Sequence, residues 1–174
     1  MRLRLGEQPL GPPAIVGFLL NKRHRQMFIR YDSHVPPHGE FVQLFSSTGW
    51  NEEYHLYPQE LFTAISYSWC VMSAYNGDRL VGFGRVVSDG VLHAMIYDLI
   101  VDPAHQGEGI GGELLLRLVK SCQDAGIRDI QLFCAAGKRS FYEHRGFRVR
   151  SEEAPGMEYI VTPVQTGSRS NPKA

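Results

Sequence analysis

The pattern of apolar and polar positions changes period several times along the chain, and each change marks a predicted element. Alternating or continuous short apolar runs indicate strands, whereas apolar residues three and four positions apart indicate helices. The predicted strands are 27–31, 71–75, 80–87, 92–101, 129–134, a run from Phe147, and 157–161. The predicted helices are 41 to about 49, 59–69 opened by Pro58, 109–125 and 138–145. Asn76-Gly77-Asp78 predicts a tight hairpin turn between the second and third strands.

Length and charge narrow the class of protein. A chain of 174 residues with 43% hydrophobic content suits one domain with a sizeable core. We therefore expect an N-terminal extension over 1–25, one domain over 26–164 and a loose tail over 165–174. Eighteen basic and eighteen acidic residues leave no net charge that would gather nucleic acid.

The cysteines and the apolar segment near the start of the chain indicate the cellular compartment. Three cysteines form no disulfide framework, and we expect all three to be small buried hydrophobes in a reducing compartment. Residues 14–20 are apolar but shorter than the roughly 20 residues that cross a bilayer. The charged stretch 21–25 follows them instead of a small-residue cleavage site. A cleaved presequence stays as the alternative to the predicted cytoplasmic location without membrane contact.

Residues 98–112 carry the most chemical information. An apolar run ends at Asp102-Pro103, a glycine-rich turn follows, and a strong helical pattern begins directly after it. The first amides of a helix have no intrahelical partner and lie at its positive dipole end. The three glycines 107, 109 and 111 carry no side chain that would keep a ligand away from these amides. The segment predicts a site for phosphate or pyrophosphate.

Two kinds of phosphate ligand bind to such a turn. Gly107-x-Gly109-x-x-Gly112 matches the dinucleotide fingerprint. That reading requires a carboxylate about 20 residues further on, at the end of the next strand. The corresponding segment, 132–135, contains no acid. A dinucleotide-dependent oxidoreductase is therefore the weakest candidate.

The other spacing resembles a family signature. Gln106-x-x-Gly109-x-Gly111, preceded by 101–103, resembles the acetyl-CoA signature of the GNAT superfamily of N-acetyltransferases. The block 141–147, Phe-Tyr-Glu-His-Arg-Gly-Phe, is similar to the late helix–turn–strand element of that family. The two blocks have the expected order and separation. The resemblance is strong over 78–161.

The chain departs from the family at one place. Many members have Asn shortly before the Tyr and Ala three residues later, where this chain has Ala135 and Lys138. The contact of that Asn cannot be carried over. Lys138 or Arg139 could reach a CoA phosphate instead, or remain a solvated surface charge.

The resemblance implies a mixed α/β (α+β) fold with a central, mostly antiparallel sheet whose middle strands splay apart and whose faces are covered by helices. Acetyl-CoA, as co-substrate, would enter the gap between the strand before the glycine turn and the strand after its helix. By resemblance, the pantetheine arm pairs with the strand end and the turn holds the pyrophosphate. The expected cofactor-binding residues are Leu99, Ile100, Val101, Gln106, Gly107, Glu108, Gly109, Ile110, Gly111 and Gly112.

Acetyl transfer also needs a proton donor for the departing thiolate. By resemblance this is Tyr142, since a phenol with a pKa near 10 is protonated at neutral pH. The alternative is that Tyr142 only packs. Asp98, His93 and Asp89 are candidate bases, but Asp98 could equally tie its strand to a neighbouring loop through a hydrogen bond, and water could accept the proton.

The acceptor side is expected at two loops that border the acceptor in the superfamily, 49–54 and 151–157. Both carry paired carboxylates, and the first adds aromatic rings, a combination that suits a cationic amine. Solvated loop glutamates are the alternative. The candidate acceptor-binding residues are Trp50, Glu52, Tyr54 and Asp98.

The predicted function is acetyl transfer from acetyl-CoA to a small primary amine, such as an arylalkylamine, a polyamine or an amino sugar, by direct attack in a ternary complex. Two alternatives stay open: a protein or peptide N-acetyltransferase, with the basic segment 22–25 as a docking site, and a CoA-binding sensor without turnover. The resemblance also allows a homodimer. The seven histidines lack zinc-type spacing, so no metal is predicted. His105, beside the turn, could touch a phosphate, although exposure to solvent is the commoner outcome.

Overall fold

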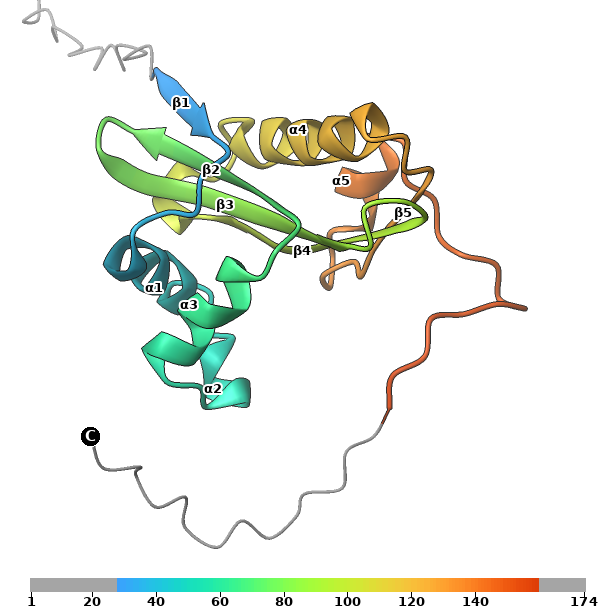
Figure 1. The fold of residues 1–174 in the computed structure, drawn as a ribbon, viewed down its shortest axis with the longest axis horizontal. Coiled ribbons are helices and arrows are strands. Elements are labelled where there is room, and N and C mark those ends of the chain that lie inside the picture. The colour runs from blue at the N-terminus through green and yellow to red at the C-terminus, as the bar shows by residue number, and fades with distance from the viewer. Residues whose placement is uncertain (1–27, 160–174) are drawn as a thin grey trace, which may run out of the picture.

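The computed structural model describes residues 28–159 as a five-stranded sheet with helices on both faces (Figure 1). In chain order the elements are β1 (Ile29–Asp32), α1 (His38–Ser46), α2 (Asn51–Tyr54), α3 (Pro58–Ser66), β2 (Cys70–Asn76), β3 (Arg79–Ser88), β4 (His93–Val101), a 3₁₀ turn (Pro103–His105), α4 (Ile110–Asp124), β5 (Asp129–Leu132) and α5 (Arg139–Glu143). Within the described residues no helix has the length and apolar character that a membrane crossing requires.

The sheet is mixed and mostly antiparallel. Strands β1 to β4 form an antiparallel meander in chain order, and β5 lies parallel to β4 after the crossover through α4. Helices α1 to α3 cover one face, and α4 and α5 lie on the other (Figure 1). The predicted fold class is confirmed.

Strands β4 and β5 pair over only part of their length. Their register runs from His93 opposite Asp129 to Ile96 opposite Leu132, where β5 ends. Strand β4 continues for five more residues, 97–101. Between residues 28 and 159 no other strand pairs with that edge of β4. The sheet therefore opens where the resemblance predicts splayed strands.

A β-bulge interrupts β4 at the start of this open segment. Phe83 lies opposite Ile100 and Arg85 opposite Tyr97, so Gly84 alone faces the two residues between them, Asp98 and Leu99. Asp98 has a φ of 51°, a left-handed conformation that is uncommon outside glycine, although Asp and Asn adopt it more readily than most residues. Bulges bend and twist a strand and often lie beside functional sites.

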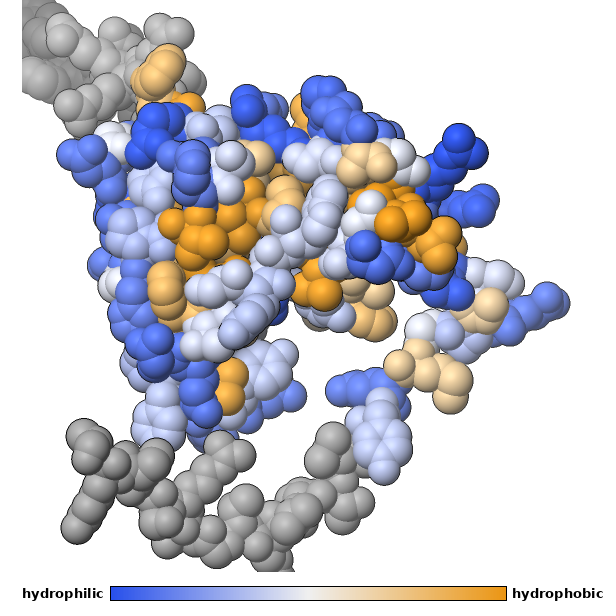
Figure 2. All heavy atoms as spheres, in the orientation of Figure 1, coloured by the Kyte–Doolittle hydropathy of each residue, from blue (hydrophilic) through white to orange (hydrophobic). Residues whose placement is uncertain are grey.

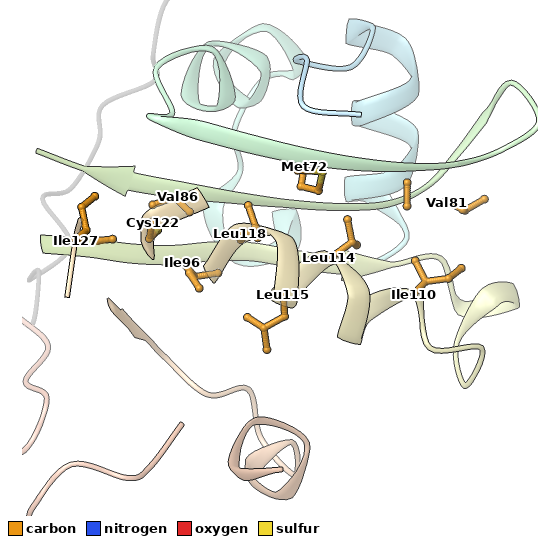
Figure 3. Packing of buried hydrophobic residues seen from close by; sticks show 12 residues of the cluster. Met72, Val81, Val86, Ile96, Ile110, Leu114, Leu115, Leu118, Cys122 and Ile127 are labelled. Atoms are coloured by element: carbon orange, nitrogen blue, oxygen red, sulfur yellow. The ribbon is translucent and has the colours of Figure 1, made fainter. Parts of the chain in front are cut away.

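Two apolar layers hold the fold together. Buried side chains of α4 pack on one sheet face, among them Leu114, Leu115 and Leu118 (Figure 3). On the opposite face Phe41, Leu44 and Phe45 of α1 join Leu61 and Ile65 of α3, together with residues of the sheet. The space-filling view shows apolar atoms gathered over the strands between polar outer surfaces (Figure 2).

Helix α4 approaches the sheet closely because β3 carries two glycines below it. A Cβ on Gly82 would lie 2.9 Å from Cδ1 of Leu114, and a Cβ on Gly84 would lie 2.8 Å from Cδ1 of Leu118. Both distances are shorter than real contacts. The glycines therefore set how near α4 lies to β3 and β4.

Several predicted boundaries are wrong. The helix predicted over 59–69 ends at Ser66, because the amide of Trp69 already donates to the carbonyl of Val86 on β3 at 2.9 Å. Strand β5 ends at Leu132, two residues before the prediction. The four-residue helix α2 was not predicted. Cys134 is exposed, whereas Cys122 is buried and Cys70 is partly buried, so burial of all three thiols is also wrong.

The strand predicted from Phe147 is absent, and the described part of the run 157–161 is not a strand. The segment after α5 contacts β5 through side chains instead of a backbone ladder. Nη1 of Arg150 donates to Oε1 of Gln131 at 2.9 Å. Phe147 packs beside Tyr142, with ring centroids 6.1 Å apart. The predicted extension 1–25, the tail 165–174 and residues 160–161 lie outside the described residues.

Candidate active site

The unpaired edge of β4 is the centre of the candidate site. The amide of Asp102 donates to the carbonyl of Val81 on β3 at 2.9 Å. Because peptide groups alternate along a strand, those of Leu99 and Val101 face the opposite, open edge. The carbonyl of Val101 accepts a hydrogen bond there from Nε2 of Gln106 at 3.1 Å. An extended ligand could pair with this edge as an added strand does.

The turn between β4 and α4 is held by Asp102. Its buried carboxylate accepts from the amide of Ala104 at 2.8 Å and forms an ion pair with Nη2 of Arg79 at 2.5 Å. Burial, the largest single effect, raises the pKa of Asp102. The Ala104 amide and the Arg79 charge outweigh it and leave the pKa below its ordinary value. The turn is therefore fixed by an ionised carboxylate at neutral pH.

His105 does not face the solvent. Its side chain is 13% exposed, its Nε2 lies 3.3 Å from Nδ2 of Asn76, and its Nδ1 lies 3.8 Å from Oδ1 of Asp102. The expectation of an exposed His105 is wrong. The ring packs behind the turn against the end of β2, so it belongs to the support of the turn.

The start of α4 supplies open main-chain donors. Gly107 and Gly109 have φ values of 82° and 85°, which side chains rarely adopt. A Cβ on either would meet nothing within 4 Å, so the space beside these amides is open. Gly109 is the N-cap residue of α4, and no side chain caps the helix. The turn fits a pyrophosphate, whose oxygens accept hydrogen bonds from such amides.

The next two glycines have a second role that the sequence did not reveal. A Cβ on Gly111 would lie 3.3 Å from Cγ2 of Val101 and 3.7 Å from Cζ of Phe141. A Cβ on Gly112 would lie 2.8 Å from Nη2 of Arg145. Helix α5 therefore packs against the first turn of α4 through a notch that these two glycines form.

Tyr142 lies on α5 beside this notch. Its ring makes an edge contact with Phe141, with centroids 5.0 Å apart, and packs against the core below α4. Burial, and to a lesser degree the nearby Cys134 thiol, raises the pKa of Tyr142 above its ordinary value. Among residues 28–159 its hydroxyl makes no hydrogen bond to a neighbour. A neutral hydroxyl with no competing partner can donate a proton.

Asp98 is engaged by a neighbouring strand. Its carboxylate forms a short ion pair with Nε of Arg85, and both side chains are more than four-fifths buried. Nη1 of the same arginine donates to the carbonyl of Ala64 on α3 at 3.1 Å. The arginine thus ties the bulge of β4 to β3 and α3, so Asp98 has a structural tie, but to a strand and a helix instead of the predicted loop. Arg85 itself was not singled out in the sequence.

The two other candidate bases lie at the far end of β4. Nδ1 of His93 pairs with Oδ2 of Asp129 at 2.7 Å, and Asp89 accepts hydrogen bonds from the amides of Val91, Leu92 and His93. Leu99 lies six positions after His93 along the strand, about 20 Å at ~3.3 Å per residue. Neither His93 nor Asp89 can reach a group bound at the open edge.

Three cationic side chains in and beside α5 differ in their surroundings. Nε of Arg139 pairs with Oε1 of Glu143 at 2.8 Å on the exposed side of the helix, which agrees with a solvated charge. Lys138 is the N-cap residue. Arg145 is the cation that contacts α4, and the sequence reading missed it. Its spacing of four residues from Phe141, on one face of a helix, was the available signal.

The structure does not bring the four candidate acceptor residues together, because Asp98 has different neighbours from the other three. Trp50 packs edge-on against Phe45, with ring centroids 5.9 Å apart. Glu52 and Tyr54 lie exposed on α2. Within 28–159 no hydrogen bond or ion pair joins them to Asp98. The loop 151–157 is exposed, and a Cβ on its Gly156 would lie 3.3 Å from Phe133 just after β5.

No group of three His, Cys, Asp or Glu side chains suited to a metal ion occurs in the described part of the chain. The donors at the candidate site are main-chain amides, a phenol and cationic side chains. Such groups bind anionic and carbonyl oxygens.

Comparison with known proteins agrees with this geometry. The model of the acetyltransferase (GNAT) family matches residues 37–147. A GNAT family acetyltransferase of known structure from Streptococcus pneumoniae superposes with a TM-score of 0.66 and 26% sequence identity, covering 78% of this chain and all of that one.

Curated relatives carry different names. An N-acetyltransferase of Prochlorococcus marinus, described as ycf52-like, is 34% identical over 113 residues, which are 62% of this chain and 61% of that protein. Histone acetyltransferase TAP1 of Glycine max is 37% identical over 79 residues, 45% of this chain and 34% of that protein. Serotonin N-acetyltransferase 2, chloroplastic, of Oryza sativa is 33% identical over 96 residues, 55% and 48% of the two chains.

The chain thus spans between about a third and three fifths of the length of the first two of these relatives. The family match covers more than half of this chain and includes the bulged strand, the glycine turn and the helix of Tyr142. On these grounds the chain belongs to the GNAT family of acetyltransferases.

Proposed function

We propose that this protein is an N-acetyltransferase that moves the acetyl group of acetyl-CoA to a primary amine by direct attack in a ternary complex. The observation that carries the proposal is the edge of β4 beyond Ile96: no strand within 28–159 pairs with it, and its end at Val101 lies close to Gly111 of α4, beside Phe141 of α5. These three parts can hold a thioester by its pantetheine arm, its phosphates and its sulfur.

The residues of the chain have distinct parts in this reaction. Peptide groups of 99–101 pair with the pantetheine arm, and an amide near Leu99 stabilises the negative charge on the acetyl oxygen. Amides of 107–112 and the side chain of Gln106 hold the pyrophosphate. The amine nitrogen bonds to the carbonyl carbon, the carbon–sulfur bond breaks, and Tyr142 gives its proton to the leaving thiolate. Water takes the proton that the ammonium must lose before it attacks. The excess proton that the nitrogen carries after the attack passes through water to the phenolate of Tyr142.

We propose a small cationic amine as the acceptor. The exposed Glu52 and the rings of Trp50 and Tyr54 supply the charge and the aromatic faces that attract ammonium groups. Some support comes from the name of the Oryza relative, a serotonin N-acetyltransferase. The name of the Glycine relative, a histone acetyltransferase, supports the alternative of a protein acceptor.

The test is CoA release from acetyl-CoA with a panel of acceptors: arylalkylamines, polyamines, amino sugars and lysine-containing peptides. We expect acetylation of a small amine with a higher kcat/KM than of any peptide. A preference for peptides would favour the protein acetyltransferase. Binding of acetyl-CoA without CoA release on any acceptor would favour a sensor and reject the enzymatic proposal.

Two further proposals concern the surroundings of the enzyme. A cytoplasmic location stays a prediction, and the word chloroplastic in the name of the Oryza relative offers an organelle as the alternative. A homodimer also stays a prediction, which sedimentation of the purified full chain tests.

A further inference from the structure

The side chain of Arg145 lies against the first turn of α4. Nη1 donates to the carbonyl of Phe141 at 2.7 Å, and the guanidinium carbon lies 4.0 Å from the centroid of the Phe141 ring. A Cβ on Gly112 would lie 2.8 Å from Nη2 and 2.9 Å from Nε. The guanidinium is therefore held from the α5 side and set against the third residue of α4.

This position is electrostatically unfavourable in the protein alone. Within residues 28–159 no carboxylate pairs with Arg145. The guanidinium also lies beside Gly112 in the first turn of α4, where the positive end of the helix dipole stabilises anions and not cations. A cation fixed beside unpartnered amides becomes favourable once an anion binds between them.

We infer that Arg145 is a phosphate-binding residue for the cofactor, which adds a side-chain contact to the main-chain donors of the glycine turn. The inference rests on the proposed function, because acetyl-CoA is the source of the phosphate. A guanidinium binds phosphate oxygens in pairs through parallel N–H groups. Contact with Phe141 fixes the orientation of this fork before the ligand arrives, so little side-chain entropy is lost on binding.

The same contacts join the phosphate site to Tyr142. Phe141 precedes Tyr142 in α5, Arg145 lies in the turn directly after α5, and both lie against the glycine notch of α4. A phosphate held by Arg145 would therefore be held by the turn that directly follows the helix of the proton donor. Replacing Arg145 should therefore affect the reaction of a donor substrate only when that substrate carries phosphate.

The experiment compares Arg145→Gln with the parent enzyme on two donors, acetyl-CoA and S-acetylpantetheine, which lacks all phosphates. We expect Arg145→Gln to weaken acetyl-CoA binding in calorimetry and to lower kcat/KM for acetyl-CoA by about tenfold, equivalent to ~1.4 kcal/mol. The kcat/KM for S-acetylpantetheine should not change. Arg145→Lys should recover part of the loss, since it keeps the charge but not the fork.

The matched control is Arg117→Gln, which removes a cation from α4 where its guanidinium lies over the ring of Tyr31. It should leave the ratio between the two donors unchanged. Acetyl-3′-dephospho-CoA distinguishes the two phosphate sources: if the effect of Arg145→Gln persists with it, the contact is to the pyrophosphate, and if the effect disappears, the contact is to the 3′-phosphate.

Two results would overturn the inference. An equal loss on both donors would mean that Arg145 only holds α5 in place. No loss on acetyl-CoA would mean that no phosphate contact exists. Failure of the unsubstituted protein to bind acetyl-CoA would be a different result, because it would reject the proposed function itself.

Discussion

Two side chains beside the open end of β4 differ in how they are held. Asp98 is in a buried ion pair with Arg85, whereas the hydroxyl of Tyr142 has no partner within the described residues. A group that must change its protonation during a reaction is better placed when no strong partner holds it. At the residue scale, Tyr142 is therefore the better candidate for proton transfer and Asp98 the better candidate for a structural role.

Tyr142→Phe should lower kcat by about a hundredfold, the lower range of general acid catalysis, with little change in KM for acetyl-CoA. The ring contacts with Phe141 and Phe147 are kept, so the loss reports the hydroxyl. Because burial raises the pKa of Tyr142, the alkaline limb of kcat in the parent enzyme should lie above about pH 10, and the variant should lack it. An unchanged kcat would show that Tyr142 only packs.

Asp98→Asn should keep most of the activity. Asn tolerates the left-handed conformation at this position and can still accept a hydrogen bond from Arg85. We expect kcat to fall by less than about fivefold, whereas loss of a general base typically costs at least a hundredfold. The control is Asp98→Leu, which can neither accept the bond nor adopt the conformation easily, and should unfold at a lower temperature.

The residue scale is also where sequence reasoning failed most. The left-handed Asp98 is not marked by Gly or Asn, so nothing in the sequence locates the bulge. His105 was expected in solvent because histidine in a loop usually is exposed, and its burial depends on the end of β2. The spacing of Arg145 from Phe141 indicates that the two share one side of the chain, but it does not show that this side faces α4.

At the scale of elements, the distance between α4 and the sheet depends on Gly82 and Gly84. Leu118, which a Cβ at Gly84 would meet at 2.8 Å, is itself fully buried and cannot move aside without displacing its neighbours. Both positions therefore require glycine for steric reasons. This holds even though the conformational freedom of glycine lowers the stability of a strand.

Gly84→Ala should lower the free energy of unfolding by about 2 kcal/mol, as overpacking does in other cores. Gly39→Ala is the control: a Cβ there meets nothing within 4 Å, and α1 should gain about 0.5–1 kcal/mol in helix propensity. Urea denaturation of both variants measures the difference. Equal effects of the two substitutions would contradict close packing at Gly84.

Elements with a sustained period were predicted, whereas the short α2 was missed and a strand was wrongly predicted from Phe147. Helix α4 and the hairpin of β2 and β3 show their periods over many residues, and the structure confirms them. The four-residue α2 is too short to show a period. The strand predicted from Phe147 is wrong because its apolar residues pack singly, Phe147 on Tyr142, while the backbone joins no ladder.

For the whole molecule, several carboxylates are stabilised in their charged form by the fold. Amide and side-chain hydrogen bonds from His34 lower the pKa of Asp32 to about 2. Hydrogen bonds also bring the pKa of other carboxylates below their ordinary values: Asp89, Asp102 and Asp129.

Acid should therefore destabilise the protein over a defined range. A carboxylate with a lowered pKa in the folded state stabilises the fold above its unfolded pKa, near 4, and this contribution is lost as the pH falls through the folded value. We expect the urea midpoint to be nearly constant between about pH 7 and pH 5 and to fall between about pH 4 and pH 2. Asp102→Asn should make that fall shallower, and a midpoint that rises in acid would contradict the expectation.

Gly111 and Gly112 impose a compromise on anyone who wishes to make this protein more heat-resistant. Replacing each with alanine would normally strengthen a helix start, since glycine costs about 1 kcal/mol per position. Here a methyl group at Gly111 would press on Val101 at the end of β4, and one at Gly112 would displace the guanidinium of Arg145. A sturdier helix start would thus come with a shifted strand end and a displaced guanidinium, so thermal hardening and cofactor binding compete at these two positions.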